Sequence, residues 1–332
     1  MQIKTTLFDA NVKLTRRTLI SFFVSAGVFI FSLFFAPFYY DGDQVPYFNA
    51  YNAVTGSDFF GGFPLYYYAV NASEPLHYVI IWVASNLGFE KNLFMAIANS
   101  FLANLIMRVF LQWRVSVYVA VVVIFTNYYL LVLYFAAERL KFGFVFLMLS
   151  LLYSRQIKLS VALAITSIFS HLQQILIYGS VVFSSVMASV WYTLNTGKIG
   201  LKKTFPLIFL ILTVLTLFYF LGDSLISKFS SYNGAAAGNS LFALWKGCIL
   251  LLFTLRYSKA RLEVVSVFAV LFLATALVGP ERINMISYCF FMFYALQYKG
   301  GVNLGVAVTS FYFGLKSIQF ILNVIDNGHG FS

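Results

Sequence analysis

Residues 16–43 read RRTLISFFVSAGVFIFSLFFAPFYYDGD, and this stretch decides the fold class of the chain. Its apolar run, 17–38, is longer than the roughly 7–15 residues of a signal-peptide core, and no small-residue cleavage site follows it. A helix needs about 20 apolar residues to cross a bilayer. The run therefore predicts a membrane anchor with a basic start and an acidic far end.

Long apolar runs also occur along the rest of the chain. Of 332 residues, 61% are hydrophobic and 10% are charged, whereas a soluble domain has about 45–50% and about 25%. Further apolar runs predict about eleven spanning helices in all: 17–38, 92–112, 115–134, 139–153, 158–178, 179–194, 204–222, 241–256, 262–279, 282–298 and 302–322. We predict an all-α polytopic integral membrane protein with one transmembrane domain, residues 1–332.

Segment 75–88 is apolar but too short to cross. At about 1.5 Å per residue it reaches only about 21 Å, against a hydrocarbon core of about 30 Å, so we expect a re-entrant or interfacial helix. With a cytoplasmic N-terminus, most Lys and Arg then face the inside and nearly every acid faces the outside. The net charge of +11 has its simplest cause in this bias, which argues against nucleic-acid binding. The longest outer connections are 39–74 and 223–240.

Arg139 and Arg282 stand out because the outer side is poor in cations. Each opens a predicted helix beside an acid, Glu138 or Glu281. The guanidinium fork matches phosphate oxygens, so both arginines are candidate ligands for a lipid-linked pyrophosphate. The alternative is that these Glu-Arg pairs are interfacial anchors or structural ion pairs.

Four outer residues are candidates for a general base: His171, Asp43, Glu74 and Glu138. Histidine takes up a proton near neutral pH, and a nearby carboxylate would raise its basicity, although a hydrogen-bonding role between helices is the alternative. Glu74 precedes Pro75 and also suits helix initiation. Asp41 and Asp43 could ligate a divalent cation, but a turn explains them equally well, and a metal is not favoured.

Aromatic residues crowd the outer connection 39–74, above all over 59–68. Such rings can stack on sugars, but they also form the aromatic belt of a membrane interface. We find no phosphate loop, zinc spacing or nucleotide-binding glycine pattern. A nucleotide-sugar donor is therefore disfavoured.

The order of these elements resembles the EpsG-like branch of the Wzy polysaccharide polymerases of the bacterial inner membrane. The resemblance rests on motifs of one or two residues each: Asp43…Tyr47…Tyr51, Glu74-Pro75, Arg139, His171, and Arg282 with Tyr288. The chain departs from the family at Leu140, where the family pattern has Gln after Arg.

The resemblance implies a fold related to the GT-C glycosyltransferases and a periplasmic reaction between undecaprenyl-pyrophosphate-linked glycans. It also implies glycan contacts at Tyr47, Tyr51 and Tyr288, no cofactor, and a chain-length regulator and a flippase as partners. Two other classes stay open. An O-antigen ligase or other lipid-sugar transferase would use the same chemistry on another acceptor, and a transporter would bind cargo without turnover.

Overall fold

The structure is a computed structural model that describes residues 3–72, 74–197, 240–278 and 280–331. These residues form helices joined by turns and contain no strand. They divide into two compact units, residues 1–172 with 300–332, and residues 173–299. The prediction of an all-α chain is therefore confirmed for the described residues.

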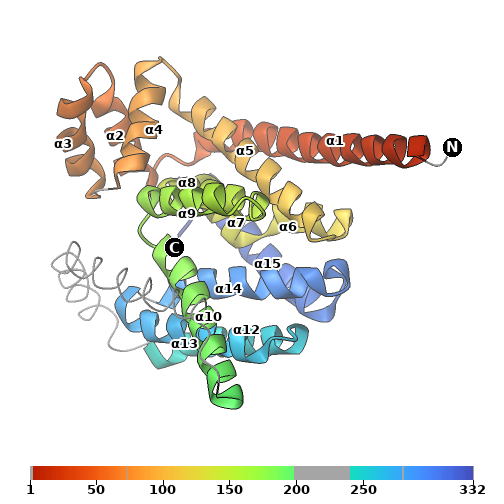
Figure 1. The fold of residues 1–332 in the computed structure, drawn as a ribbon. Coiled ribbons are helices and arrows are strands. Elements are labelled where there is room, and N and C mark those ends of the chain that lie inside the picture. The colour runs from red at the N-terminus through yellow and green to blue at the C-terminus, as the bar shows by residue number, and fades with distance from the viewer. Residues whose placement is uncertain (1–2, 73, 198–239, 279, 332) are drawn as a thin grey trace. The chain divides into compact units, whose positions relative to one another are not determined.

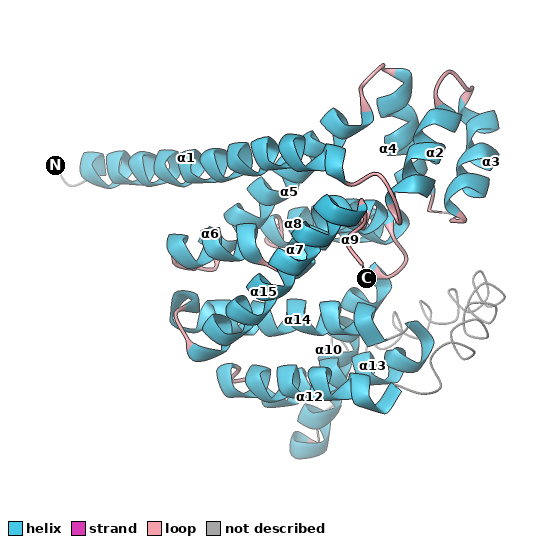
Figure 2. Cartoon of the chain, turned by 180° about the vertical axis from the view of Figure 1, so that it is seen from behind, coloured by secondary structure: helices cyan, strands magenta, loops and turns pink. Residues whose placement is uncertain are grey.

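The first unit holds most of the predicted site. Its helices are α1 (Ile3–Phe35), η1 (Ala36–Phe38), α2 (Gln44–Val54), α3 (Phe59–Val70), α4 (Pro75–Asn86), α5 (Lys91–Gln112), α6 (Val117–Thr126), α7 (Tyr128–Phe135), α8 (Glu138–Leu152), α9 (Ile157–Ser170) and α15 (Leu304–Asn327). The second unit holds α10 (Gln174–Thr196), α12 (Ser240–Tyr257), α13 (Arg261–Val278) and α14 (Pro280–Gln297), and η2 (Tyr298–Gly301) precedes α15. Figures 1 and 2 trace these helices from two opposite sides.

Four described helices are long and apolar enough to cross a membrane: Arg16–Phe38, Lys91–Gln112, Gln174–Thr196 and Leu304–Asn327. A fifth span results if α6 and α7, which meet at an angle of 54°, are one broken helix. The described residues thus support a membrane protein, and the count of eleven spans stays a prediction. The predicted span 204–222 and the predicted connection 223–240, up to residue 239, lie outside them.

Two predicted helix boundaries differ from the structure. The run 115–134 is interrupted at Asn127, whose side chain accepts hydrogen bonds from the backbone N–H groups of Tyr129 and Leu130 and so starts α7. The run 158–178 ends at Ser170, because His171 has an extended backbone, and α10 begins at Gln174. The Asn127 side chain thus stops one helix that hydropathy alone would continue, and the extended backbone of His171 stops the other.

The connection 39–74 is largely helical. Asp58 caps α3 by accepting hydrogen bonds from the N–H groups of Phe60 and Gly61. Tyr66 of α3 is fully buried and packs against Tyr78 of α4, with ring centroids 5.6 Å apart. These contacts join α2, α3 and α4 into a small helical cluster.

The long helices of the first unit run antiparallel in pairs. In α1 and α5, Ser32 contacts Asn99 while Ser25 contacts Ser100. In α8 and α9, Ser150 contacts Ser160, and the Ser167 hydroxyl donates to the Gly143 carbonyl of α8. The starts of α5 and α8 and the end of α9 therefore lie at one end of the unit. Basic residues gather toward the opposite end: Arg16, Arg17, Arg108, Arg114, Arg155 and Lys158.

Single-cysteine labelling tests whether α4 crosses the membrane. In a Cys248→Ser, Cys289→Ser background, Thr55→Cys precedes α3, Leu87→Cys follows α4, and Gln112→Cys is at the last residue of α5; all three positions are exposed. Because α4 has only 12 residues, we expect an impermeant thiol reagent to label the first two from the same side and Gln112→Cys from the other. Labelling of Thr55→Cys and Leu87→Cys from opposite sides would contradict this topology.

Candidate functional site

Glu74, Arg139 and His171, which are far apart in the sequence, meet in one polar cluster. The Arg139 Nη1 donates to Glu74 Oε2 at 2.9 Å, and the His171 Nδ1 lies 3.0 Å from Glu74 Oε1. Both oxygens of one carboxylate are therefore engaged, one by a guanidinium and one by an imidazole. The structure brings together three of the predicted site residues around Glu74.

Local chain geometry delivers Glu74 to this cluster. Glu74 occupies the N-cap position of α4, followed by Pro75 at the first helical position, which is the helix initiation that the sequence indicates. Its side chain, however, makes no capping hydrogen bond. The carboxylate turns away from the helix it starts and reaches the beginning of α8 and the end of α9.

His171 is placed by the end of α9. Its backbone N–H donates to Ser167 O at 3.2 Å, and its φ of −160° takes the chain out of the helix. A histidine at this point projects from the terminus and is not held inside the helix pair. Only 13% of its side chain is exposed, against 22% for Arg139 and 7% for Glu74. The cluster is thus shielded but still reachable, with Arg139 as its most accessible member.

Electrostatics fix the charge state of Glu74. Burial raises the pKa of its carboxyl group, but the hydrogen bond with His171 and the charge of Arg139 outweigh this effect and lower the pKa to about 2. Glu74 therefore stays ionised at physiological pH. A carboxylate that holds its proton this weakly is a poor general base, because a base works best when its pKa lies near the operating pH.

A layer of buried rings backs the cluster. The Arg139 Nε donates to the Tyr47 hydroxyl at 3.4 Å, and the rings of Tyr47 and His77 lie 6.0 Å apart. The Tyr66 hydroxyl lies 2.8 Å from His77 Nδ1. Burial, followed by the positive charge of Arg139, lowers the pKa of His77 well below its usual value, so this histidine is neutral.

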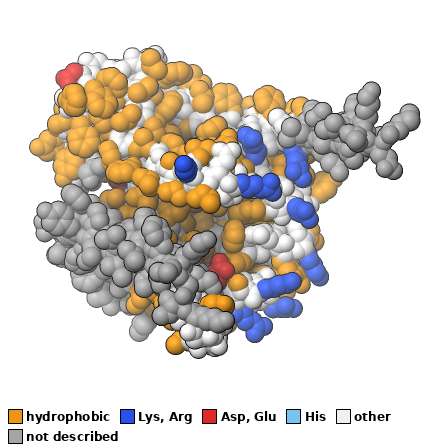
Figure 3. Space-filling model, viewed as in Figure 1, with side chains coloured by type: hydrophobic (Ala, Val, Ile, Leu, Met, Phe, Trp, Pro, Cys, Tyr) orange, Lys and Arg blue, Asp and Glu red, His pale blue; other side chains and the backbone are white. Residues whose placement is uncertain are grey.

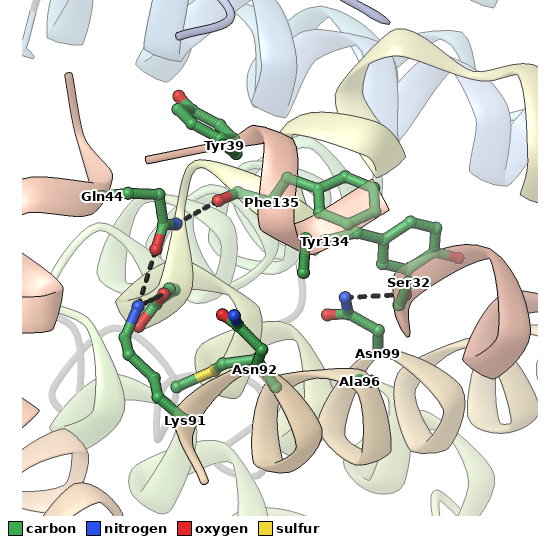
Figure 4. Close-up of a pocket in the computed structure, with 12 residues that line it drawn as sticks. Ser32, Tyr39, Gln44, Lys91, Asn92, Ala96, Asn99, Tyr134 and Phe135 are labelled. Atoms are coloured by element: carbon green, nitrogen blue, oxygen red, sulfur yellow. Dashed lines mark hydrogen bonds and ion pairs between the residues drawn. The ribbon is translucent and has the colours of Figure 1, made fainter. Parts of the chain in front are cut away.

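Glu138 belongs to a second, deeper cluster. The Lys91 Nζ donates to Glu138 Oε1 at 2.8 Å and to Gln44 Oε1 at 2.7 Å, and it lies 3.8 Å from the centre of the Phe48 ring. The Gln44 amide donates in turn to the Phe135 carbonyl. Figure 4 shows this arrangement, with Lys91 and Gln44 pointing toward each other from different helices.

This second cluster lines a cavity of about 20 Å³, room for about one water molecule. Lys91 and Glu138 are 4% and 2% exposed. Because both charges are buried and paired, the geometry favours the structural ion pair for Glu138, and its role as a base stays a prediction. Gln44 and Tyr47 lie one turn apart on α2, so that helix contacts the two clusters at once.

The remaining predicted residues lie elsewhere. Asp43 is exposed at the start of α2, and Asp41 accepts a hydrogen bond from the N–H of Gly42. The Tyr51 hydroxyl donates to the Phe89 carbonyl at 2.7 Å. Tyr288 is buried in α14 of the second unit. The Arg282 side chain lies outside the described part of the structure, so its pyrophosphate role stays a prediction.

Sequence reasoning missed Lys91 and Gln44. A signal for Lys91 is present, since it is a cation on the predicted acid-rich side, as Arg139 is. Gln44 gives no comparable signal, because an uncharged polar residue in an outer connection is common. The described residues contain no group of three or more His, Cys, Asp or Glu side chains arranged to hold a metal ion.

The comparisons with known proteins add no information about the site. No family model, curated protein or solved structure matches the chain.

Proposed function

We propose that this chain is a glycosyltransferase that joins lipid-linked oligosaccharide repeat units at the periplasmic face of a bacterial inner membrane. The growing glycan would leave its undecaprenyl pyrophosphate and pass to a hydroxyl group of the next lipid-linked unit. The observation that carries the proposal is the meeting of Arg139, Glu74 and His171 at the acid-rich end of the first unit. An anion ligand and a proton acceptor in one place suit glycosyl transfer from a pyrophosphate.

Arg139 would bind the leaving group. Two of its N–H groups contact Glu74 and Tyr47, while a guanidinium has five. The other donors are available to phosphate oxygens, and 22% of the side chain is exposed. As the bond from the anomeric carbon to the pyrophosphate oxygen breaks, negative charge grows on that oxygen, and a fixed guanidinium stabilises it.

His171 would take the acceptor proton. The oxygen of the acceptor hydroxyl forms the new bond to the anomeric carbon, and its proton moves to the ring nitrogen of His171, while the pyrophosphate leaves with the bonding electrons. Glu74 contacts His171 Nδ1 at 3.0 Å, and this contact orients the imidazole ring. The carboxylate also stabilises the imidazolium that forms, as in other paired histidine bases.

Complementation of a deletion strain tests the function and the role of Arg139 together. Loss of the polymer ladder with single-repeat glycolipid retained supports a polymerase. Retained polymer that no longer reaches its final acceptor indicates a ligase, and missing surface glycan with normal polymer inside indicates a transporter. A deletion strain that still makes a normal ladder would end the proposal.

Arg139→Ala is expected to abolish the ladder at a normal protein level. Arg139→Lys should restore it poorly, because an ammonium group cannot contact Glu74, Tyr47 and a phosphate through one planar fork. The matched control is Arg155→Ala, which removes an exposed arginine at the opposite end of the unit and should leave the ladder unchanged. Arg282→Ala is expected to abolish the ladder as well. Wild-type ladders from both alanine variants would remove the pyrophosphate assignment.

A further inference from the structure

Helix α3 carries an aromatic face that is open to its surroundings. Its exposed large side chains away from α4 are Phe60, Leu65, Tyr67 and Tyr68, and Phe60 and Tyr68 are more than 80% exposed, whereas Phe59 packs against Tyr78 and Trp82 of α4. The opposite side of α3 is buried at Gly62 and Tyr66, which face α4. The helix therefore packs on the protein through one side only and presents rings on the other.

The exposed face of α3 lacks the charged residues that are common on a water-exposed surface. The helix from Phe59 to Val70 contains no charged residue, and Asp58 uses its carboxylate to cap the helix. Soluble surfaces seldom gather large apolar side chains in one place without a partner. In Figure 3 the hydrophobic side chains over α2, α3 and α4 form a broad surface at the upper left.

The position of α3 identifies the partner. Figures 1 and 2 show α2, α3 and α4 beyond the end of α1 that is opposite the N-terminus, with α3 and α4 running across the direction of α1. The candidate span formed by α1 and η1 ends at Phe38, and Phe34, one turn earlier, is 73% exposed. The aromatic face thus lies beyond the far end of a candidate spanning helix, where hydrocarbon would give way to headgroups.

We propose that α3 lies in the membrane interface, with its aromatic face in contact with lipid. Phenylalanine rings reach the acyl boundary and tyrosine hydroxyls reach the headgroups, as in the aromatic belts of membrane proteins. A neutral aromatic surface matches this layer better than it matches a charged partner. Asn71 ends α3 with left-handed backbone geometry, and Glu74 follows three residues later. Seating α3 in the interface therefore fixes the depth of Glu74 and the residues that contact it.

Spin labels test the contact with lipid directly. In the Cys248→Ser, Cys289→Ser background, nitroxides are attached to Phe60→Cys, Tyr68→Cys and, as the control, Asn52→Cys on the exposed side of α2. The full chain is placed in lipid nanodiscs, and collision rates with oxygen and with a water-soluble nickel chelate are measured. Oxygen concentrates in lipid and the chelate in water. We expect the ratio of oxygen to nickel collisions at positions 60 and 68 to be several-fold above that at position 52.

Two results would overturn the proposal. Nickel collision rates at positions 60 and 68 equal to the rate at position 52 would show that the face is in water. Immobile labels that neither reagent reaches would show that protein covers it, such as a second copy of the chain. The measurement needs no glycan substrate, so it stands whether or not the polymerase proposal holds.

Discussion

Lys91→Met is expected to destabilise the protein more than any other single change in the site, by about 3–5 kcal/mol. The substitution leaves the Glu138 carboxylate buried without its charged partner, and Glu138 is only 2% exposed. A charge in a protein interior has lost its hydration and depends on a partner for compensation. Gln44 loses a hydrogen bond at the same time. The measurement is the apparent unfolding temperature in detergent, followed by helical signal.

The double variant Lys91→Met with Glu138→Leu separates charge from packing. Replacing both members of a buried ion pair by apolar groups of similar size is often nearly neutral, so the double variant should recover most of the lost stability. Lys158→Met, which removes an exposed lysine, is the matched control and should change little. If Lys91→Met behaves like Lys158→Met, or if the double variant stays as unstable as the single one, the buried pair does not hold the helices together.

Glu138 and Arg139 are neighbours in the sequence but contact different helices. On the first turn of α8, Glu138 points to the start of α5 and Arg139 points to Glu74. The sequence places both residues on the outer side but gives no measure of which way each faces. That direction depends on where α5 and α4 pack against α8, which is tertiary information.

Other parts of the site were open to prediction to different degrees. Charge asymmetry predicts that Glu74, Arg139 and His171 lie on one side of the membrane, because the bias acts on whole loops. Their contact follows from helix ends that meet, and the antiparallel order of α8 and α9 makes the start of one and the end of the other neighbours. The helices within 39–74 were missed because their glycines, prolines and turn residues mask the periodicity by which a helix is recognised.

Glu74 and His171 give the last prediction, which concerns pH. The pKa of Glu74 is lowered to about 2, so its stabilising contribution is complete above the usual carboxyl value and is lost only as the pH falls from about 5 toward 2. Titration of Glu74 therefore cannot alter activity near neutral pH. If His171 is the base, polymerase activity should fall on acidification at or above roughly pH 6–7, where an isolated histidine takes up its proton, because the Glu74 carboxylate favours the imidazolium.

Glu74→Gln is expected to move this acidic fall in activity to lower pH. The amide keeps a hydrogen-bonding group beside His171 Nδ1 but removes the negative charge that favours the imidazolium. Maximal activity should also drop, because Arg139 loses its charged partner. His171→Ala should abolish chain extension while lipid-linked substrate still binds, and a purely structural histidine would instead lower the protein level. The profiles are measured with purified protein and lipid-linked repeat units. Wild-type activity that persists well below pH 5, together with an inactive Glu74→Gln at every pH, would transfer the role of base to Glu74, and a fully active His171→Ala would exclude His171.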